Sequence, residues 1–419
     1  MSKNNFEVAR EKYSEIGVDV NKAIEKLSQI PLSMQCWQGD DVGGFEKDDS
    51  TLSNGGIQVT GNYPGKARNI KELQDDLDVM YSLLPGKHRL NLHAIYGDFG
   101  GTFVDRDKIE GKHFDRWVEW AKEKDVKIDF NATCFSHPLA DAGFTLSSKD
   151  KKTREFWINH VRCAREISVY IGKKQGTTCI HNLWIPDGSK DIPVDRLGYR
   201  QILKDSLDEI FKKEYDKKDM KDAVECKLFG IGSESYVVGS HEFYVGYAIR
   251  NNIMPCFDLG HFHPTELVAD KISSILLFSD ELLLHVSRPM RWDSDHIVIY
   301  NDDIIFLSQE LVRSGRLNDI HIGLDFFDAT VNRIGAWTIG ARATLKGLLF
   351  ALLEPTDTLK KYENDGNYFA RLALLEEVKS MPFGLVWDYY CEKMNVPTDR
   401  KLIEIIQQYE NDVLSKRSV

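Results

Sequence analysis

Short apolar runs alternate with segments of helical periodicity along most of this 419-residue chain. A short apolar run is typical of a buried strand, whereas apolar positions spaced three and four residues apart indicate an amphipathic helix. The expected strands are 33–37, 89–96, 126–134, 182–188, 224–229, 253–257, 282–284 and 321–327. The expected helices between them are 69–84, 113–124, 149–172, 193–216, 241–251, 264–280 and 303–315.

This alternation predicts an α/β fold. Eight strands separated by helices favour a (β/α)8 TIM barrel; a doubly wound open sheet is the alternative, and the strand count separates the two. Helical periodicity also covers 6–29 before the first strand, and 329–352, 356–378, 383–393 and 400–416 after the last. The sequence therefore predicts an N-terminal helical segment (1–30), a catalytic barrel (31–352) and an α-helical C-terminal extension (353–419) used for packing or subunit contact.

Acidic and imidazole side chains recur where the later apolar runs stop. Asp258 follows one run, His285 ends the next, and Glu225 and Asp325 mark two more. A single buried Asp or His is usually a structural residue, but four strand ends with these side chains are what a divalent cation needs. Glu225 and Lys227 lie two residues apart, so we expect them on one strand and on the same side of it.

Charge balance bears on the number of cations. Asp293 and Asp295 would add two carboxylates to Glu225, Asp258 and Asp325. Two divalent cations together with Lys227 would neutralise all five, whereas one cation would leave uncompensated charge in a partly dry cavity. Oxygen and nitrogen ligands without thiolate favour Mn, Mg or Co over structural zinc.

Composition narrows the class of partner. The net charge of −11 argues against nucleic acid and against an anionic membrane surface. No apolar run reaches the roughly 20 residues of a membrane span, and the N-terminus lacks the apolar core of a signal peptide. The seven cysteines are scattered without CxxC spacing, which is typical of reduced thiols in a cytoplasm.

Several stretches of sequence resemble L-rhamnose isomerases, a family within the xylose-isomerase-like barrels. They include Trp184-Ile185-Pro186-Asp187-Gly188, His285-Val286-Ser287-Arg288-Pro289 and Gly323-Leu324-Asp325-Phe326-Phe327-Asp328. The other matching stretches are 34–41, 61–68, 91–96, 134–138, 227–232, 260–266 and 291–296. Together they span nearly the whole chain.

The resemblance implies interconversion of L-rhamnose and L-rhamnulose by a cytoplasmic, tetrameric, Mn²⁺-dependent enzyme, with Co²⁺ or Zn²⁺ as alternative ions. It further implies a structural metal and a catalytic metal, with Asp258 as a possible bridge between them. The implied structural ligands are Glu225, Asp258, His285 and Asp325, and the implied catalytic ligands are His261, Asp293 and Asp295.

The other expected roles follow from side-chain chemistry. Lys227 either stabilises charge on a substrate oxygen or pairs with Glu225, while His93 either bonds a sugar hydroxyl or is a buried structural residue. Aromatic rings suit a sugar face, although such rings are also barrel core. The expected catalytic residues are Lys227, Asp325 and His261, and the expected substrate contacts are Trp37, His93, Trp184, Lys227 and Asp293, with Phe130 as a further candidate for the wall. His263 and His296 are expected to support ligands rather than to be ligands.

Aldose–ketose isomerisation moves one hydrogen between C1 and C2, either as a hydride or as a proton through an enediol. Nearly every carboxylate expected at the barrel mouth is assigned to a metal, which favours the metal-assisted hydride shift. The alternatives are another sugar isomerase or epimerase, a metal-dependent hydrolase using Arg288 and Arg291 for phosphate, and a non-catalytic sugar-binding protein.

Overall fold

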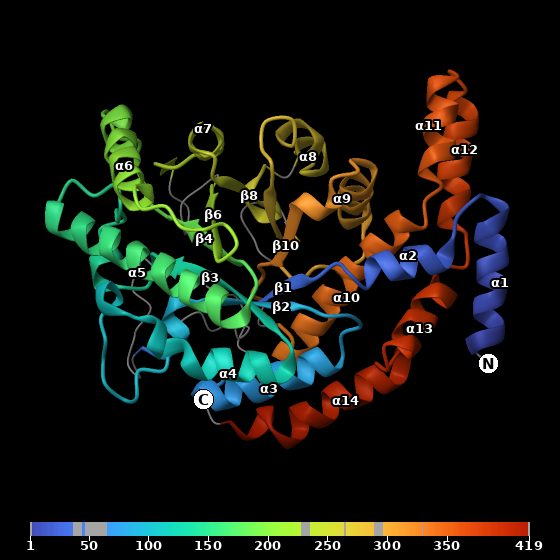
Figure 1. Cartoon of the computed structure of the whole chain (residues 1–419), viewed down its shortest axis with the longest axis horizontal. Helices are drawn as coiled ribbons and strands as arrows, with labels where there is room; N and C mark the ends of the chain where they lie inside the picture. The colour runs from blue at the N-terminus through green and yellow to red at the C-terminus, as the bar shows by residue number, and fades with distance from the viewer. Residues whose placement is uncertain are drawn as a thin grey trace.

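Eight parallel strands close into a barrel at the centre of the molecule (Figure 1). The computed structural model describes residues 2–36, 44–46, 65–227, 235–263, 265–288, 296–328 and 330–417. The barrel strands are β1 (Leu32–Gln35), β2 (Arg89–His93), β3 (Lys127–Thr133), β4 (Cys179–Trp184), β6 (Met220–Glu225), β8 (Met254–Asp258), β9 (Leu282–Val286) and β10 (Ile320–Leu324). Because β1 pairs with both β2 and β10, the sheet has no open edge. The predicted TIM barrel is confirmed, and the open sheet is excluded.

Helices surround the barrel, and their ends follow local sequence signals. The N-terminus of α3 is capped by Asn69, whose side chain accepts from the Glu72 amide, and Asn301 caps α9 through the Ile304 amide. Helix α4 stops where Asp125 adopts a left-handed conformation. The surrounding helices are α3 (Ile70–Ser82), α4 (Asp115–Lys124), α5 (Lys151–Gln175), α6 (Arg196–Phe211), α7 (His241–Asn251), α8 (Ala269–Ile275), α9 (Asp302–Arg313) and α10 (Arg333–Leu352).

The terminal helices pack on each other and on the barrel. Phe6 of α1 stacks on Tyr389 of α13 with ring centroids 3.6 Å apart. Near the C-terminus, Tyr409 and Arg417 both bond to buried Asp76 of α3. The terminal elements are α1 (Ser2–Glu15), α2 (Val20–Leu27), α11 (Thr356–Asn364), α12 (Tyr368–Lys379), α13 (Phe383–Lys393) and α14 (Asp399–Asp412). The predicted helical C-terminal extension is present, while the division at residues 30 and 352 stays a prediction.

Two predicted single helices are each two helices. The segment 6–29 breaks at Gly17, whose φ of +81° disfavours other residues, and Asp19 caps the second helix. The segment 356–378 breaks in the same way at Gly366, with φ of +68° and Asn367 as the next cap. The apolar spacing continues across both breaks, which is why periodicity alone missed them.

The strand expected at 224–229 lies several residues earlier, at Met220–Glu225. The first half of this strand contains the charged residues Lys221 and Asp222, so it did not match the apolar pattern of a strand. The strand accommodates these charges because Lys221 pairs with Glu281 and Asp222 pairs with Arg165. Glu225 is therefore the last strand residue and Lys227 follows the strand, so the prediction that they share a strand is wrong. Strand β4 likewise begins three residues before its predicted start, at Cys179. The two-residue strands β5 (Gly188–Ser189) and β7 (Tyr236–Val237) were not predicted.

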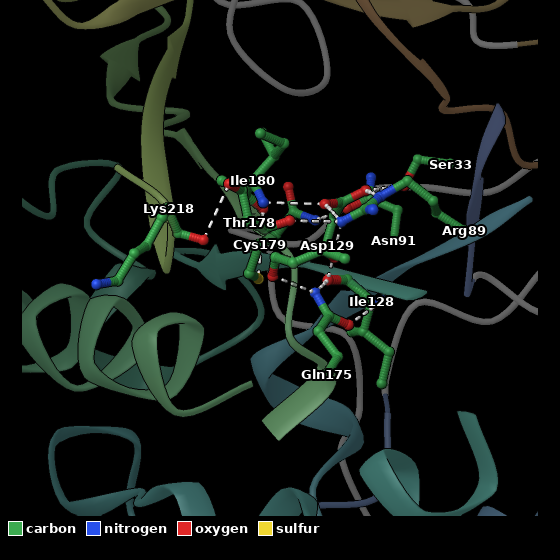
Figure 2. Close-up of polar contacts among 12 residues, drawn as sticks. Ser33, Arg89, Asn91, Ile128, Asp129, Gln175, Thr178, Cys179, Ile180 and Lys218 are labelled. Carbon is green, nitrogen blue, oxygen red and sulfur yellow. Dashed lines mark hydrogen bonds and ion pairs between the residues drawn. The ribbon is translucent and has the colours of Figure 1, made fainter. Parts of the chain in front are cut away.

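An ion pair lies inside the N-terminal end of the barrel (Figure 2). Arg89 donates from Nε and Nη2 to the two carboxylate oxygens of Asp129, at 2.7 Å each. Asp129 also accepts from Ser33 Oγ at 2.7 Å and from the Ile180 amide at 2.9 Å. Burial raises the pKa of Asp129, but Arg89 and these donors outweigh it and the pKa is lowered. This satisfied network serves stability, while the opposite end of the strands is left for chemistry.

Helix α10 is buried on nearly all sides because it packs between the barrel and helices α2, α3 and α9. Among the described residues, no single helix has both the length and the apolarity to cross a membrane. Helices α10 and α11 pass that test only as a pair, and they meet at a bend of 53°.

Candidate metal and substrate site

The C-terminal ends of four neighbouring strands bring together the acidic and imidazole side chains predicted from the sequence. Strands β6, β8, β9 and β10 are adjacent in the barrel. Asp258 is paired in register with His285, and the Asp325 amide donates to the Val286 carbonyl at 3.2 Å, just past the last residue of β10. Parallel strands present their carboxyl ends at one mouth, so residues distant in sequence meet there.

The His285 ring lies at the centre of this group. Its Nδ1 is 3.2 Å from Glu225 Oε2, 3.4 Å from Asp325 Oδ2 and 3.8 Å from Asp258 Oδ2. Glu225, Asp258 and His285 are each only 1% exposed, and the Asp325 side chain is 20% exposed. The arrangement offers one imidazole nitrogen and three carboxylates to a common point.

This group fits a divalent cation. Within the described residues, Glu225 Oε1 and His285 Nδ1 are buried without a hydrogen-bond partner. Burial lowers the pKa of His285, but Cys256, Glu225 and Asp325 raise it, and the net pKa lies well above its ordinary value. Concentrated buried negative charge thus calls for a positive partner, and an oxygen-rich ligand set with one imidazole suits a hard or borderline ion.

A second grouping, of Glu225, Cys256 and His285, is a poorer ligand set. Burial raises the pKa of the Cys256 thiol, so the thiolate that a metal needs is disfavoured. The four-residue set with Asp258 and Asp325 is the better candidate.

His261 follows β8 in a short 3-10 turn, Leu259–His261. Its Nδ1 lies 2.7 Å from the Cys226 carbonyl, which can only accept, so Nδ1 carries the proton. The acceptor of the ring is then Nε2, as a metal ligand requires. This bond supports the predicted ligand role of His261. Asp293 and Asp295, predicted to share that metal, lie outside the described residues.

Comparison with known proteins identifies the family of this chain. Residues 1–417 match the L-rhamnose isomerase family. The chain belongs to the L-rhamnose isomerase family. The L-rhamnose isomerase of Rhodopirellula baltica is 56% identical over 413 residues, covering 99% of this chain and 96% of its own. The L-rhamnose isomerase of Salmonella paratyphi B is 53% identical, with 99% and 98% covered. The chain is accordingly an isomerase.

One matching solved structure has a distant likeness to this isomerase. D-Psicose 3-epimerase from Clostridium cellulolyticum is 12% identical and aligns with 70% of this chain and 95% of its own, with a TM-score of 0.43. Nothing about the site follows from a likeness at that level.

Aromatic and cationic side chains lie beside the candidate metal-binding group of this isomerase. Trp184 is the last residue of β4, and its ring stacks with that of His261 at 6.3 Å. Lys227 Nζ lies 4.8 Å from the centre of the Trp184 ring, and Phe135 packs on the ring edge-on. Trp184 and Lys227 are thus brought next to the cluster as predicted, and their roles toward substrate stay predictions. Trp37, the other predicted wall residue, lies outside the described residues.

His93 ends β2 and faces the mouth, with Nδ1 3.3 Å from Thr133 Oγ1. Burial lowers its pKa to about 3, so the ring is neutral at physiological pH and can both donate and accept. Phe130 does not line the site: it is fully buried on the outer face of β3, edge-on to Phe114. His263 bonds to Thr265, and His296 lies 3.3 Å from Asp328.

Sequence reasoning missed the groups that hold the ligands. Asp258 Oδ1 accepts from the Gly260 amide at 2.6 Å and from Ser287 Oγ at 3.2 Å. Glu225 Oε2 accepts from Asn182 Nδ2 at 2.6 Å. The available signal was spacing, because Asn182 precedes Trp184 by two residues on one strand and shares its face.

Proposed function

We propose that this isomerase interconverts L-rhamnose and L-rhamnulose with a divalent cation held by Glu225, Asp258, His285 and Asp325. One observation carries the proposal: His285 Nδ1 lies between 3.2 and 3.8 Å from carboxylates of three other strand ends. The match to the family over residues 1–417 supplies the sugar.

We further propose a second cation held by His261, Asp293 and Asp295, and Mn²⁺ as the ion, with Co²⁺ or Zn²⁺ as substitutes. The proton on His261 Nδ1 supports this role, because it leaves Nε2 to a metal. Oxygen-rich ligation also agrees with Mn²⁺.

When bound, a divalent cation polarises the sugar carbonyl and lowers the pKa of the neighbouring hydroxyl. The chain's own groups then hold and orient the sugar. Lys227 stabilises negative charge that develops on a substrate oxygen, and the Trp184 face covers an apolar side of the ring. His93, neutral and at the mouth, bonds a hydroxyl. Asp325 and His261 contribute to catalysis as members of the set of metal ligands.

The decisive experiment is a sugar panel with chelator-treated enzyme, resupplied with Mn²⁺, Co²⁺, Mg²⁺ or Zn²⁺ and followed by NMR. We expect chelation to abolish turnover and Mn²⁺ or Co²⁺ to restore formation of L-rhamnulose. Full activity without metal would contradict the proposal. An epimerised product would indicate a sugar epimerase, phosphate release from esters a hydrolase, and sugar binding that survives chelation without turnover a binding protein.

We also propose that the chain assembles as a homotetramer and works in the cytoplasm. Helix α12 exposes Tyr368, Phe369 and Leu372, and Figure 1 shows α11 and α12 projecting from the barrel. Clustered exposed apolar side chains of this size are typical of subunit contacts. All seven cysteines are free, which supports a reducing compartment.

A further inference from the structure

Asn182 is the hydrogen-bond donor to a buried carboxylate of the proposed metal site. It lies on β4, is 3% exposed, and donates from Nδ2 to Glu225 Oε2 at 2.6 Å. A carboxylate only accepts, so the amide nitrogen must face Glu225. Among the described residues, the other polar groups near Glu225 are His261 Nδ1, 3.3 Å from Oε1, and His285 Nδ1, 3.2 Å from Oε2.

An amide suits this position because it is neutral. A Lys or Arg here would hold the carboxylate but would repel an incoming cation, and an apolar side chain would leave the carboxylate free to turn. Asp258 is held in the same manner, by the neutral donors Gly260 N and Ser287 Oγ. Neutral donors therefore orient both buried carboxylates before a metal arrives.

The other side of Asn182 borders a cavity of about 170 Å³ that extends from the N-terminal end of the barrel. Its lining includes Ser33, Arg89 and His285, while Glu225 is not part of it. At about 30 Å³ per molecule, the cavity has room for several waters. Asn182 both lines this space and bonds to Glu225, so loss of the amide would leave the carboxylate free to rotate.

We propose that Asn182 is a positioning residue that fixes the Glu225 carboxylate for metal binding. The inference rests on the proposed metal-dependent function and extends it to a residue that is not itself a ligand. Partners that orient a ligand in this way contribute roughly 10- to 100-fold to metal affinity.

The test compares Asn182→Leu with Asn131→Leu. Asn131 is a matched control: it is the register neighbour of Asn182 on β3, is 2% exposed, and donates to Asn91 rather than to Glu225. Each purified enzyme is freed of metal with a chelator, and its affinity for Mn²⁺ alone is measured by calorimetry and by electron paramagnetic resonance. Melting temperatures of the metal-free proteins report the structural cost separately.

We expect Asn182→Leu to weaken Mn²⁺ binding by about 10- to 100-fold and Asn131→Leu by less than about 3-fold. Excess Mn²⁺ should restore most of kcat in Asn182→Leu, because the ligands remain. Unchanged affinity in Asn182→Leu, or an equal loss in both variants, would overturn the inference. If the Leu variant does not fold, Asn182→Ser, which shortens the side chain, replaces it in the comparison. Unfolding of both Asn182 variants while Asn131→Leu folds would also overturn it. Failure of the wild type to bind Mn²⁺ would instead defeat the proposed function.

Discussion

His285 depends on its neighbours for both charge and space. Three carboxylates face its Nδ1, and its other edge lies against Gly323 of β10, the residue paired with it in register. A methyl group at Gly323 would come within 3.1 Å of His285 Cδ2 and 3.2 Å of the Leu284 carbonyl oxygen. The orientation of His285, a proposed metal ligand, therefore depends on the absence of a side chain at Gly323, two residues before Asp325.

Gly323→Ala should displace the His285 ring by a few tenths of an ångström and weaken metal binding by about 10-fold, on the scale of other groups that support a ligand. Mn²⁺ titration of the chelated enzyme measures the effect. Gly246→Ala is the control, because a methyl group there meets nothing within 4 Å. Wild-type affinity in Gly323→Ala would show that the ring has more room than the structure gives it.

The groups near the sugar also bear on how its hydrogen moves. A base near C2 needs a pKa close to the working pH, but His93 has a pKa of about 3 and the neighbouring carboxylates are ligand candidates. We therefore expect a hydride shift from C2 to C1. L-Rhamnose deuterated at C2, converted in ordinary water, should yield L-rhamnulose that retains deuterium at C1. Extensive loss of deuterium to solvent would indicate an enediol and a base that has not been assigned.

At the scale of elements, strands that end in a charged residue were the most predictable part of the site. Asp258 ends β8, His285 lies one residue before the end of β9 and Asp325 follows β10, so a change from apolar to polar residues marked all three. The start of β6 was not visible, because ion pairs let Lys221 and Asp222 sit inside a strand. Asn182 was missed because its spacing from Trp184 marks the face on which it lies but does not identify its partner, Glu225.

The link between β1 and β2 gives a pH prediction. His88 Nδ1 accepts from the Leu32 amide at 3.2 Å, and Nε2 bonds to the Pro85 carbonyl at 3.1 Å, which requires the neutral ring. Burial lowers the pKa of His88 to about 4. The unfolded chain, with a histidine pKa near 6.5, binds more protons between these values, so the free energy of unfolding should fall as pH drops from about 6.5 to 4.

In His88→Asn the free energy of unfolding should depend less steeply on pH, by up to about one proton per molecule, although the variant is less stable at neutral pH. Urea unfolding of metal-free protein at a series of pH values measures it. His160, with a pKa lowered to about 3 by burial, contributes the same trend and stays in both proteins. Parallel curves for wild type and variant would contradict the account of His88.

The whole molecule combines a barrel with helices contributed by both ends of the chain. Figure 1 shows α1 beside α13, and α14 running along α3 toward the C-terminus. Helices α11 and α12 stand apart, and α12 leaves 83% of Phe369 and 61% of Tyr368 exposed. The exposed apolar side chains of α12 are one feature of the fold that a single chain does not explain.

Phe369→Asp should break the proposed tetramer into smaller species, because it places a charge in an apolar contact. Light scattering after size-exclusion chromatography gives the mass. Glu377→Lys on the same helix also changes charge at an exposed position and should leave the assembly intact. A wild-type mass for Phe369→Asp would mean that α12 faces solvent in the assembly.

The central claim is that a divalent cation bound by Glu225, Asp258, His285 and Asp325 supports isomerisation. It is tested most directly by anomalous diffraction from Mn²⁺-loaded crystals of enzyme shown to be active, measured on both sides of the manganese edge. We predict an anomalous peak bounded by Glu225, Asp258, His285 and Asp325. An active enzyme with no metal among these four residues would contradict the claim.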